Sequence, residues 1–360
     1  MFGVLKKITI QMMVGANIST IIVMLLVGFS DYINPATHPL LACIGLTFPI
    51  FLAINFLFFI FWLIFYSKKA WLPLLGYLVC IVPLRTYFPI NFRLEPPDGT
   101  IKVLSYNVLG FAPTETDEDG NNSILEYIKN SDADIVCLQE AVMYDVKKEV
   151  VDSVLSKYQY RDTTMIVSDS ANNALAVYSK YPILSKERIK YKSVGNVSMA
   201  YKLKIDGDTV LVINNHLESN KLTLHDKSQY KRMFKNIKRD TVEVESKKLI
   251  VKLGEALQLR CKQADAVAAY IRKHKKMSII LCGDFNDNPI SYTHRVITKD
   301  LNDCYVRSGF GPGLSYNQKG FNVRIDNIMC SNDWKSFNCR VDNNIDASDH
   351  YPIYCWLKKR

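Results

Sequence analysis

Charged side chains are missing from two long stretches near the N-terminus, and this is the clearest pattern along the chain. No charge occurs between residues 8 and 30 or between residues 39 and 67, and a helix needs roughly 20 apolar residues to cross a bilayer. A third stretch, 70–90, contains Arg85 and three prolines that kink or end a helix. The pattern predicts membrane helices at 8–30 and 39–67, and a third at 70–90.

Lysine pairs flank these stretches and predict their orientation. Lys6-Lys7 precede the first stretch and Lys68-Lys69 follow the second, so the positive-inside rule places both pairs in the cytoplasm. If 70–90 crosses, the remaining chain lies on the extracytoplasmic face, whereas a re-entrant segment leaves it inside. A signal peptide at 8–30 is the alternative, but Val27-Gly28-Phe29 is a poor cleavage site. We therefore expect a multi-pass anchor in the lipid bilayer.

The pattern changes in a Pro-Pro-Asp-Gly segment at 96–99, which is typical of a short stiff linker. Residues 1–95 are thus the predicted transmembrane region, and residues 96–360 are predicted to form one soluble domain of the size of an enzyme. Short β-rich runs follow the linker, at 101–106, 134–138, 174–178, 209–213, 278–282, 324–329 and 351–357. Helical patterns lie between some of them, at 123–129, 146–156 and 254–274. This mixture predicts an α/β (α+β) fold in which helices cover the outer faces of packed sheets.

Polar residues recur where the apolar runs stop. Sheet enzymes keep their sites at strand ends, so these positions are candidates for chemistry. They are Asn107, Glu140, His216, Asp284, Asn286, Asp326, Asp349 and His350. Taken singly, each also has an ordinary structural explanation: Glu140 suits a helix start, Gly283 to Pro289 suits a turn, and a lone histidine is usually structural.

The order of these segments resembles the endonuclease/exonuclease/phosphatase superfamily. Its strongest elements here are Gly-Asp-Phe-Asn at 283–286 and Ser-Asp-His-x-Pro at 348–352, behind Gln139-Glu140 and Asn215-His216-Leu217. The resemblance covers about 101–357. It implies a four-layer α/β/β/α sandwich with two sheets packed face to face, preceded here by the membrane region, and a site along one sheet edge.

The resemblance also implies a role for each candidate. Glu140 and Asp349, with Asn107 beside them, are expected to hold Mg²⁺ or Mn²⁺, which prefer oxygen ligands. Asp284 would deprotonate the attacking water, and Asn286 would donate to the phosphate or hold the nucleophile. His350, oriented by Asp326, and His216 would stabilise the charge that develops on the phosphate. Leu109 departs from abasic-site endonucleases, which often carry an acidic ligand there, and this favours the non-repair branches.

The charge balance and the cysteines are less informative about function than these motifs. The chain carries a formal charge of +10, which suits an anionic substrate but is also an ordinary solubility device. Residues 221–252 hold ten Lys or Arg against four Asp or Glu and could form either a lipid- or nucleic-acid-binding arm or a solvated helical insertion. Nine cysteines without a C-x-x-C pair are expected to be buried thiols.

We therefore expect a membrane-anchored, divalent-metal-dependent phosphoesterase that hydrolyses phosphodiesters or phosphomonoesters. Its substrate would be a nucleic acid or a phospholipid headgroup, because both readings share every candidate residue, and no obligate protein partner is evident. Two other classes stay open. One is a catalytically silent phosphate- or lipid-binding module on the same fold, and the other is a small channel or transporter built from the apolar region.

Overall fold

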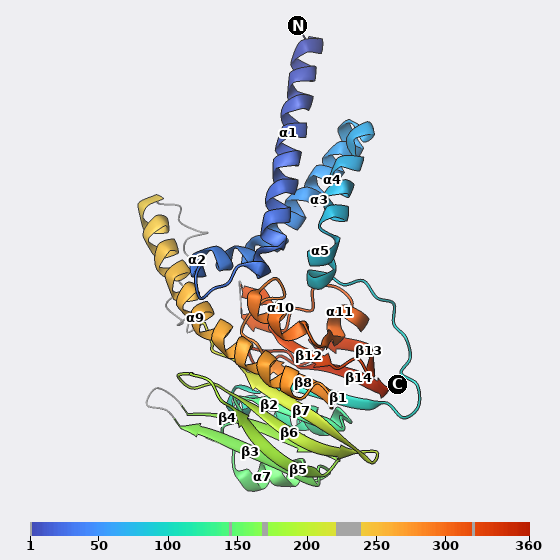
Figure 1. The fold of residues 1–360 in the computed structure, drawn as a ribbon, viewed down its shortest axis with the longest axis vertical. Helices are drawn as coiled ribbons and strands as arrows, with labels where there is room; N and C mark the ends of the chain where they lie inside the picture. Colours follow the sequence, from blue (N-terminus) through green and yellow to red (C-terminus); the bar gives the residue numbers. More distant parts are fainter. Residues whose placement is uncertain (1, 144–145, 168–171, 221–238, 319–320) are drawn as a thin grey trace.

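The N-terminal helices project from one end of an α/β domain (Figure 1). The computed structural model describes residues 2–143, 146–167, 172–220, 239–318 and 321–360. The helices are α1 (Phe2–Gly28), α3 (Phe48–Phe65), α4 (Trp71–Val79) and α5 (Ile81–Tyr87). Gly3–Tyr32 and Pro39–Phe65 are long and apolar enough to cross a membrane, and the α4–α5 pair, bent by 73°, is either a broken span or a re-entrant loop. The bend agrees with the prolines of this stretch.

Buried amides tie the helices together. Asn17 donates to Asn55 over 3.2 Å and accepts from the indole of Trp62 over 3.0 Å, while Asn55 donates to the carbonyl of Pro73 over 2.9 Å. A buried polar group is costly unless it is hydrogen-bonded, so these contacts fix how α1, α3 and α4 pack.

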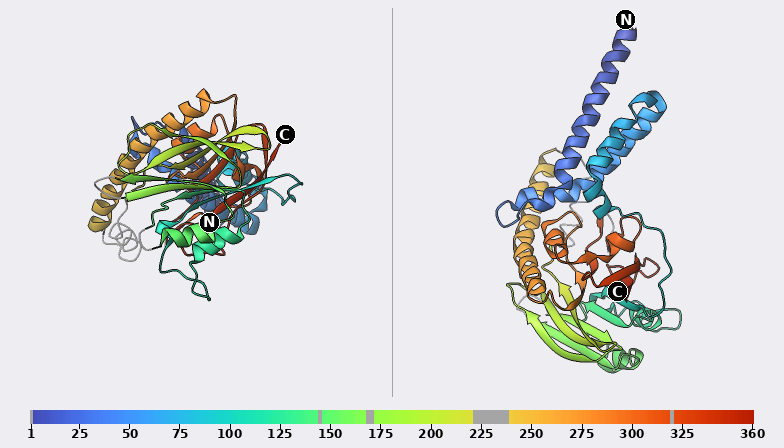
Figure 2. Two further views of the ribbon diagram at one scale, coloured as in Figure 1. Left: turned by 90° about the horizontal axis from the view of Figure 1, so that it is seen from below. Right: turned by 45° about the vertical axis from the view of Figure 1, so that its right-hand side comes forward.

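Short helices form a foot where the bundle meets the α/β domain. They are η1 (Ser30–Tyr32), α2 (Pro39–Ala42) and η2 (Cys43–Thr47), so the apolar stretch predicted at 39–67 is divided, and its first nine residues lie beside α9 (Figures 1 and 2). Arg295 of α10 (Tyr292–Thr298) donates to the carbonyl of Asp31 over 2.9 Å. The foot therefore joins the N-terminal helices to the α/β domain.

Two six-stranded sheets form the centre of the domain. The first has the order β13-β14-β1-β2-β4-β3, and the second β5-β6-β7-β8-β12-β9. The strands are β1 (Ile101–Asn107), β2 (Ile135–Gln139), β3 (Tyr160–Val167), β4 (Asn172–Ser179), β5 (Ile183–Ile189), β6 (Val197–Ile205), β7 (Asp208–His216), β8 (Ser278–Asp284), β9 (Asn302–Asp303), β12 (Asp326–Cys330), β13 (Trp334–Val341) and β14 (Ile353–Lys359). A separate hairpin pairs β10 (Tyr316–Gln318) with β11 (Phe321–Val323).

Three apolar cores separate four layers. One core joins the facing sides of the two sheets. A second lies between the first sheet and α6 (Ser123–Asn130) with α7 (Lys148–Val154), and a third between the second sheet and α9 (Arg239–Lys273) with α10. The α11 helix (Cys304–Ser308) packs against β13 and β12. This arrangement confirms the predicted α/β/β/α sandwich, and the nine cysteines are buried and free.

Some elements differ from the sequence-based expectation. Seven strands were not predicted: β3, β5, β6, β9, β10, β11 and β13. Strand β5 is mostly exposed and carries Lys186-Glu187-Arg188, so it lacks an apolar pattern. Helix α9 begins at Arg239 rather than at 254. The basic arm predicted at 221–252 falls mainly outside the described residues, which resume at 239.

Candidate active site

Strand register brings the candidate residues together. In the first sheet the parallel strands β1 and β2 align Asn107 with Gln139, so Glu140 follows directly beside Asn107. In the second sheet the parallel strands β7 and β8 align His216 with Asp284, and antiparallel β12 aligns Asp326 with Asp284. Because the two sheets pack face to face, the ends of these five strands meet at one edge.

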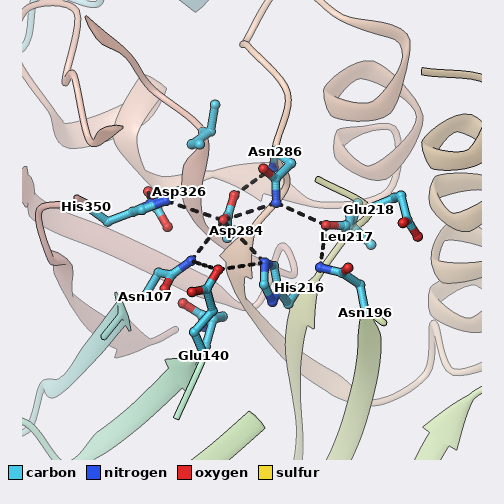
Figure 3. A network of polar contacts seen from close by, with 12 residues as sticks. Asn107, Glu140, Asn196, His216, Leu217, Glu218, Asp284, Asn286, Asp326 and His350 are labelled. Atoms are coloured by element: carbon cyan, nitrogen blue, oxygen red, sulfur yellow. Dashed lines mark hydrogen bonds and ion pairs between the residues drawn. The ribbon is translucent and has the colours of Figure 1, made fainter. Parts of the chain in front are cut away.

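Asp284 lies at the centre of the resulting network (Figure 3). Its carboxylate accepts from the Asn107 amide over 3.2 Å and from the Asn286 backbone N–H over 2.7 Å. The Nε2 atoms of His216 and His350 each lie 3.7 Å from Asp284 Oδ2. Two imidazoles and two amides therefore converge on one buried carboxylate.

Gly283 is required for this placement. Residues with a side chain rarely adopt its φ of +134°, and a Cβ there would lie 2.0 Å from the carbonyl oxygen of Asn215. Asn286 and Glu140 also have left-handed backbones, with φ of +53° and +52°. Asn tolerates this region better than most residues, whereas a glutamate there is uncommon. Backbone strain of this kind is concentrated at functional sites.

Glu140 sits at the mouth of the site. Its Oε1 accepts from the Asn107 amide over 3.2 Å and lies 3.7 Å from His216 Nε2, and 37 % of its side chain is exposed. Burial raises the pKa of Glu140, while the charge of His350 and the Asn107 hydrogen bond act in the opposite direction. The open side of this carboxylate is accessible to a ligand or ion.

His350 and Asp326 form a buried hydrogen-bonded pair, with 2.8 Å between His350 Nδ1 and Asp326 Oδ2. Burial would lower the pKa of His350, but the carboxylates of Asp326 and Asp284 outweigh it and raise the pKa to about 10. The imidazole is accordingly a cation at neutral pH. The Tyr316 ring from β10 lies edge-on against it, with 5.1 Å between ring centres.

Burial also shifts the pKa values of Asp284 and His216, in opposite directions. Burial raises the pKa of Asp284 to about 6, with Asp326 acting in the same direction and the histidines against it. Burial lowers the pKa of His216, opposed by Asp284. A carboxylate with a pKa near neutrality is suited to accept and release a proton.

Three residues support the site: Asn173 was missed in the sequence, whereas Gln139 and Ser348 belong to the quoted motifs but were given no role. Asn173 at the start of β4 lies 3.0 Å from His216 Nδ1 through its amide nitrogen, and the Ser348 hydroxyl donates to the Asn107 carbonyl over 2.7 Å. Gln139 donates across the two sheets to Asn214 over 2.7 Å. Polar residues within otherwise apolar strands, as in Asn172-Asn173 and Asn214-Asn215, were the available signal.

Arg260 of α9 holds two of the site loops together and was also missed. This buried guanidinium donates to the Glu218 carbonyl over 2.7 Å and to Asp287 over 3.3 Å. Glu218 follows His216 by two residues and Asp287 follows Asp284 by three, so one side chain connects the segments after β7 and β8.

Two carboxylates of the site fit a divalent cation. Glu140 Oε2 and the carboxylate of Asp349 accept no hydrogen bond from the described residues, and the charge of Asp349 raises the pKa of Glu140. A cation beside these carboxylates would offset the repulsion between their charges. Ligand atoms of Asp284, Asp326 and His350 also lie within 4.8 Å of one another, so this buried cluster could hold a metal ion as well. The Asn107 amide donates to the carboxylates of Glu140 and Asp284.

Comparisons with known proteins agree with this fold. Residues 104–350 match the model of the endonuclease/exonuclease/phosphatase family, and residues 10–87 match that of a domain of unknown function. The human Nocturnin catalytic domain with bound sulfate is 17% identical, with a TM-score of 0.51 over 75% of this chain and 97% of its own.

Two further solved structures are similar. The D. rerio TDP2 complex with single-strand DNA product has a TM-score of 0.50 at 16% identity, over 73% of this chain and 100% of its own. An endonuclease/exonuclease/phosphatase from Beutenbergia cavernae has a TM-score of 0.51 at 16% identity, over 72% of each chain. At these identities the likeness establishes the fold alone. No curated protein matches the chain.

Proposed function

Since the chain belongs to the endonuclease/exonuclease/phosphatase family, and is therefore a hydrolase of phosphoester bonds, we propose that it is a membrane-anchored phosphoesterase that depends on a divalent metal. The observation that carries the proposal is the convergence of Asn107, His216, Asn286 and His350 on the buried carboxylate of Asp284. Its substrates are phosphodiesters or phosphomonoesters, from nucleic acid or phospholipid headgroups.

The carboxylates at the mouth of the site would hold the metal. Glu140 and Asp349 are the proposed ligands of Mg²⁺ or Mn²⁺, with Asn107 fixing the Glu140 carboxylate by its hydrogen bond. When bound, such an ion neutralises charge on the phosphate oxygens and polarises the phosphorus centre. The open face of Glu140 supports this assignment.

The remaining residues divide the chemistry of water attack. Asp284 takes a proton from the attacking water, for which a pKa of about 6 is suited. The amide of Asn286, which donates to Asp284 over 3.2 Å, orients that carboxylate. The His350 cation is held by Asp326, and the buried Nε2 of His216 has no hydrogen-bond partner among the described residues. The Nε2 atoms of both histidines lie 3.7 Å from Asp284 Oδ2. They would stabilise charge on the phosphate oxygens and the leaving oxygen.

The membrane anchor also favours one orientation of the domain. In α1, Ile21 lies beside Gly76 of α4, and Gly28 lies beside Pro83 of α5, so α4–α5 runs alongside α1 towards the domain. The lysine pairs thus lie at the opposite end of the bundle from the domain, and the positive-inside rule places the domain on the extracytoplasmic face. We expect alkaline phosphatase fused after Arg360 to be active in a bacterial host and the same reporter fused after Lys69 to be inactive. The reverse pattern would place the domain in the cytoplasm.

Hydrolysis by the purified full-length chain tests the proposed activity. The panel contains bis(p-nitrophenyl) phosphate, plasmid DNA, RNA and phospholipid vesicles, each with Mg²⁺, Mn²⁺ or chelator. We expect turnover of at least one ester with metal and none with chelator. Asp284→Asn removes the proton acceptor while keeping the size of the side chain, and should lower the rate by roughly 10²–10⁴-fold.

Asp206→Asn is the matched control. Asp206 is exposed in a turn with φ of +47°, which asparagine tolerates, so this variant should keep the wild-type rate. Wild-type hydrolysis by Asp284→Asn would remove Asp284 from the mechanism. If the chain binds the same esters but hydrolyses none of them with either metal, the result would favour the catalytically silent phosphate- or lipid-binding module instead.

A further inference from the structure

An apolar cavity lies at the junction of the membrane helices and the soluble domain. Its volume is about 420 Å³, within the range of roughly 300–1,000 Å³ that is typical of ligand pockets. The foot helices α2 and η2, the start of α3, and Leu249, Ile250 and Leu253 of α9 form most of its wall. None of the described residues that line it carries a charge.

The membrane side of this junction cavity is continuous with the apolar surface of the bundle. Leu40, Leu46 and Ile50 line the cavity and are 52 %, 43 % and 56 % exposed. All three belong to the apolar segment Pro39–Phe65 that is long enough to cross a bilayer. On α9, Ile250 is 41 % exposed beside them. Exposed apolar surface of this extent marks contact with a membrane or an apolar ligand.

The opposite wall belongs to the segments that carry the active site. Asn288 lines the cavity four residues after Asp284, which is at most about 14 Å along an extended chain. Val323 lines it three residues before Asp326, at most about 11 Å away. Between Asn288 and the foot, Ile290 packs into the apolar cluster of Met24, Val27 and Phe48. The cavity therefore lies between the bilayer and the catalytic loops.

We propose that the junction cavity holds a hydrocarbon chain of a membrane phospholipid whose phosphate ester lies at Asp284. This assignment deepens the proposed function, on which it rests, and makes a long-chain lipid phosphoester the substrate class. The described lining residues are mostly apolar and carry no charge. Such a wall suits a hydrocarbon chain, whereas binding of a nucleic-acid backbone depends on Lys and Arg. The occupant enters from the bilayer because the foot helices belong to both the cavity and the anchor.

Photolabelling tests occupancy without relying on turnover. The full-length Asp284→Asn chain is placed in phosphatidylcholine nanodiscs that contain phosphatidylcholine with a diazirine at the end of one acyl chain, and labelled peptides are mapped after irradiation. We expect label on the α9 peptide that contains Leu249 and Leu253, in addition to α1 and α3. Leu253→Trp, or Thr47→Trp from the facing wall, should reduce the α9 label at least fivefold while α1 and α3 keep theirs.

Val251→Trp is the matched control, because Val251 lies on the same helix, is 48 % exposed and does not line the cavity. It should leave the α9 label unchanged. Label confined to α1 and α3, or α9 label that neither cavity-filling variant reduces, would overturn the proposal.

Hydrolysis rates separate the cavity from the catalytic proposal. Leu253→Trp should lower kcat/KM for a long-chain phospholipid at least tenfold and leave bis(p-nitrophenyl) phosphate unchanged. Two outcomes would refute the lipid assignment and leave the proposed phosphoesterase activity intact. In one, Leu253→Trp lowers kcat/KM equally for both substrates. In the other, the wild-type chain cleaves small esters but no long-chain ester. If the wild-type chain cleaves neither class, the proposed function fails, and the labelling result alone decides the cavity.

Discussion

At the scale of single residues, the site depends on hydrogen bonds that fix each functional group. His216 illustrates this: one ring nitrogen faces Asp284 and Glu140, while the other lies 3.0 Å from the Asn173 amide nitrogen. The amide is a donor at that distance, so it favours the tautomer in which Nδ1 accepts and Nε2 carries the proton. A proton on Nε2 is what stabilisation of a phosphate oxygen requires.

Removal of the Asn173 amide is expected to weaken catalysis without unfolding the domain. Asn173→Ala loses one hydrogen bond of about 1 kcal/mol, and we expect kcat to fall roughly tenfold with little change in KM. Asn173→Asp should be at least as impaired, because a carboxylate cannot donate to Nδ1. Asn332→Ala, an exposed amide at the far end of β12, should keep full activity. Unchanged kcat in Asn173→Ala would show that His216 needs no orienting partner.

At the scale of elements, the foot is in close contact with the loop after β8, which follows Asp284. Gly45 of η2 approaches this loop so closely that a Cβ would lie 2.2 Å from the carbonyl oxygen of Ile290. Ile290 in turn packs among α1 and α3 residues. Ile290 lies six residues after Asp284, so we expect a displacement of Ile290 to disturb the loop that follows Asp284.

Gly45→Ala is therefore expected to destabilise the junction. Overpacking costs about 1–3 kcal/mol, so thermal unfolding of the full-length chain in detergent should occur at a lower temperature, with reduced hydrolysis. Gly15→Ala is the matched control, since a Cβ at Gly15 in α1 meets nothing within 4 Å and alanine is the better helix former by roughly 1 kcal/mol. An equal Tm for Gly45→Ala and the wild type would mean that the foot does not constrain the loop.

At the scale of the whole molecule, the sequence predicted the layers, and its candidate residues lie together at one sheet edge, but it did not predict the junction. Polar residues after apolar runs identified Asn107, Glu140 and Asp284, because a strand end is a local feature that periodicity reveals. Strand β5 was missed because most of its side chains are exposed, so its sequence shows no alternation of apolar and polar residues. The contact of α2 with α9 and the cavity between them join segments more than 200 residues apart, and no local pattern records such a packing.

The central claim, that Asp284 directs water onto the phosphorus of a phosphoester, is tested most directly by hydrolysis in ¹⁸O-labelled water with Mg²⁺ present. The account predicts one ¹⁸O atom in the phosphate-containing product of the wild-type chain and none in the alcohol, with product formation by Asp284→Asn reduced by at least two orders of magnitude. Label in the alcohol, or labelled phosphate formed by Asp284→Asn at the wild-type rate, would contradict it.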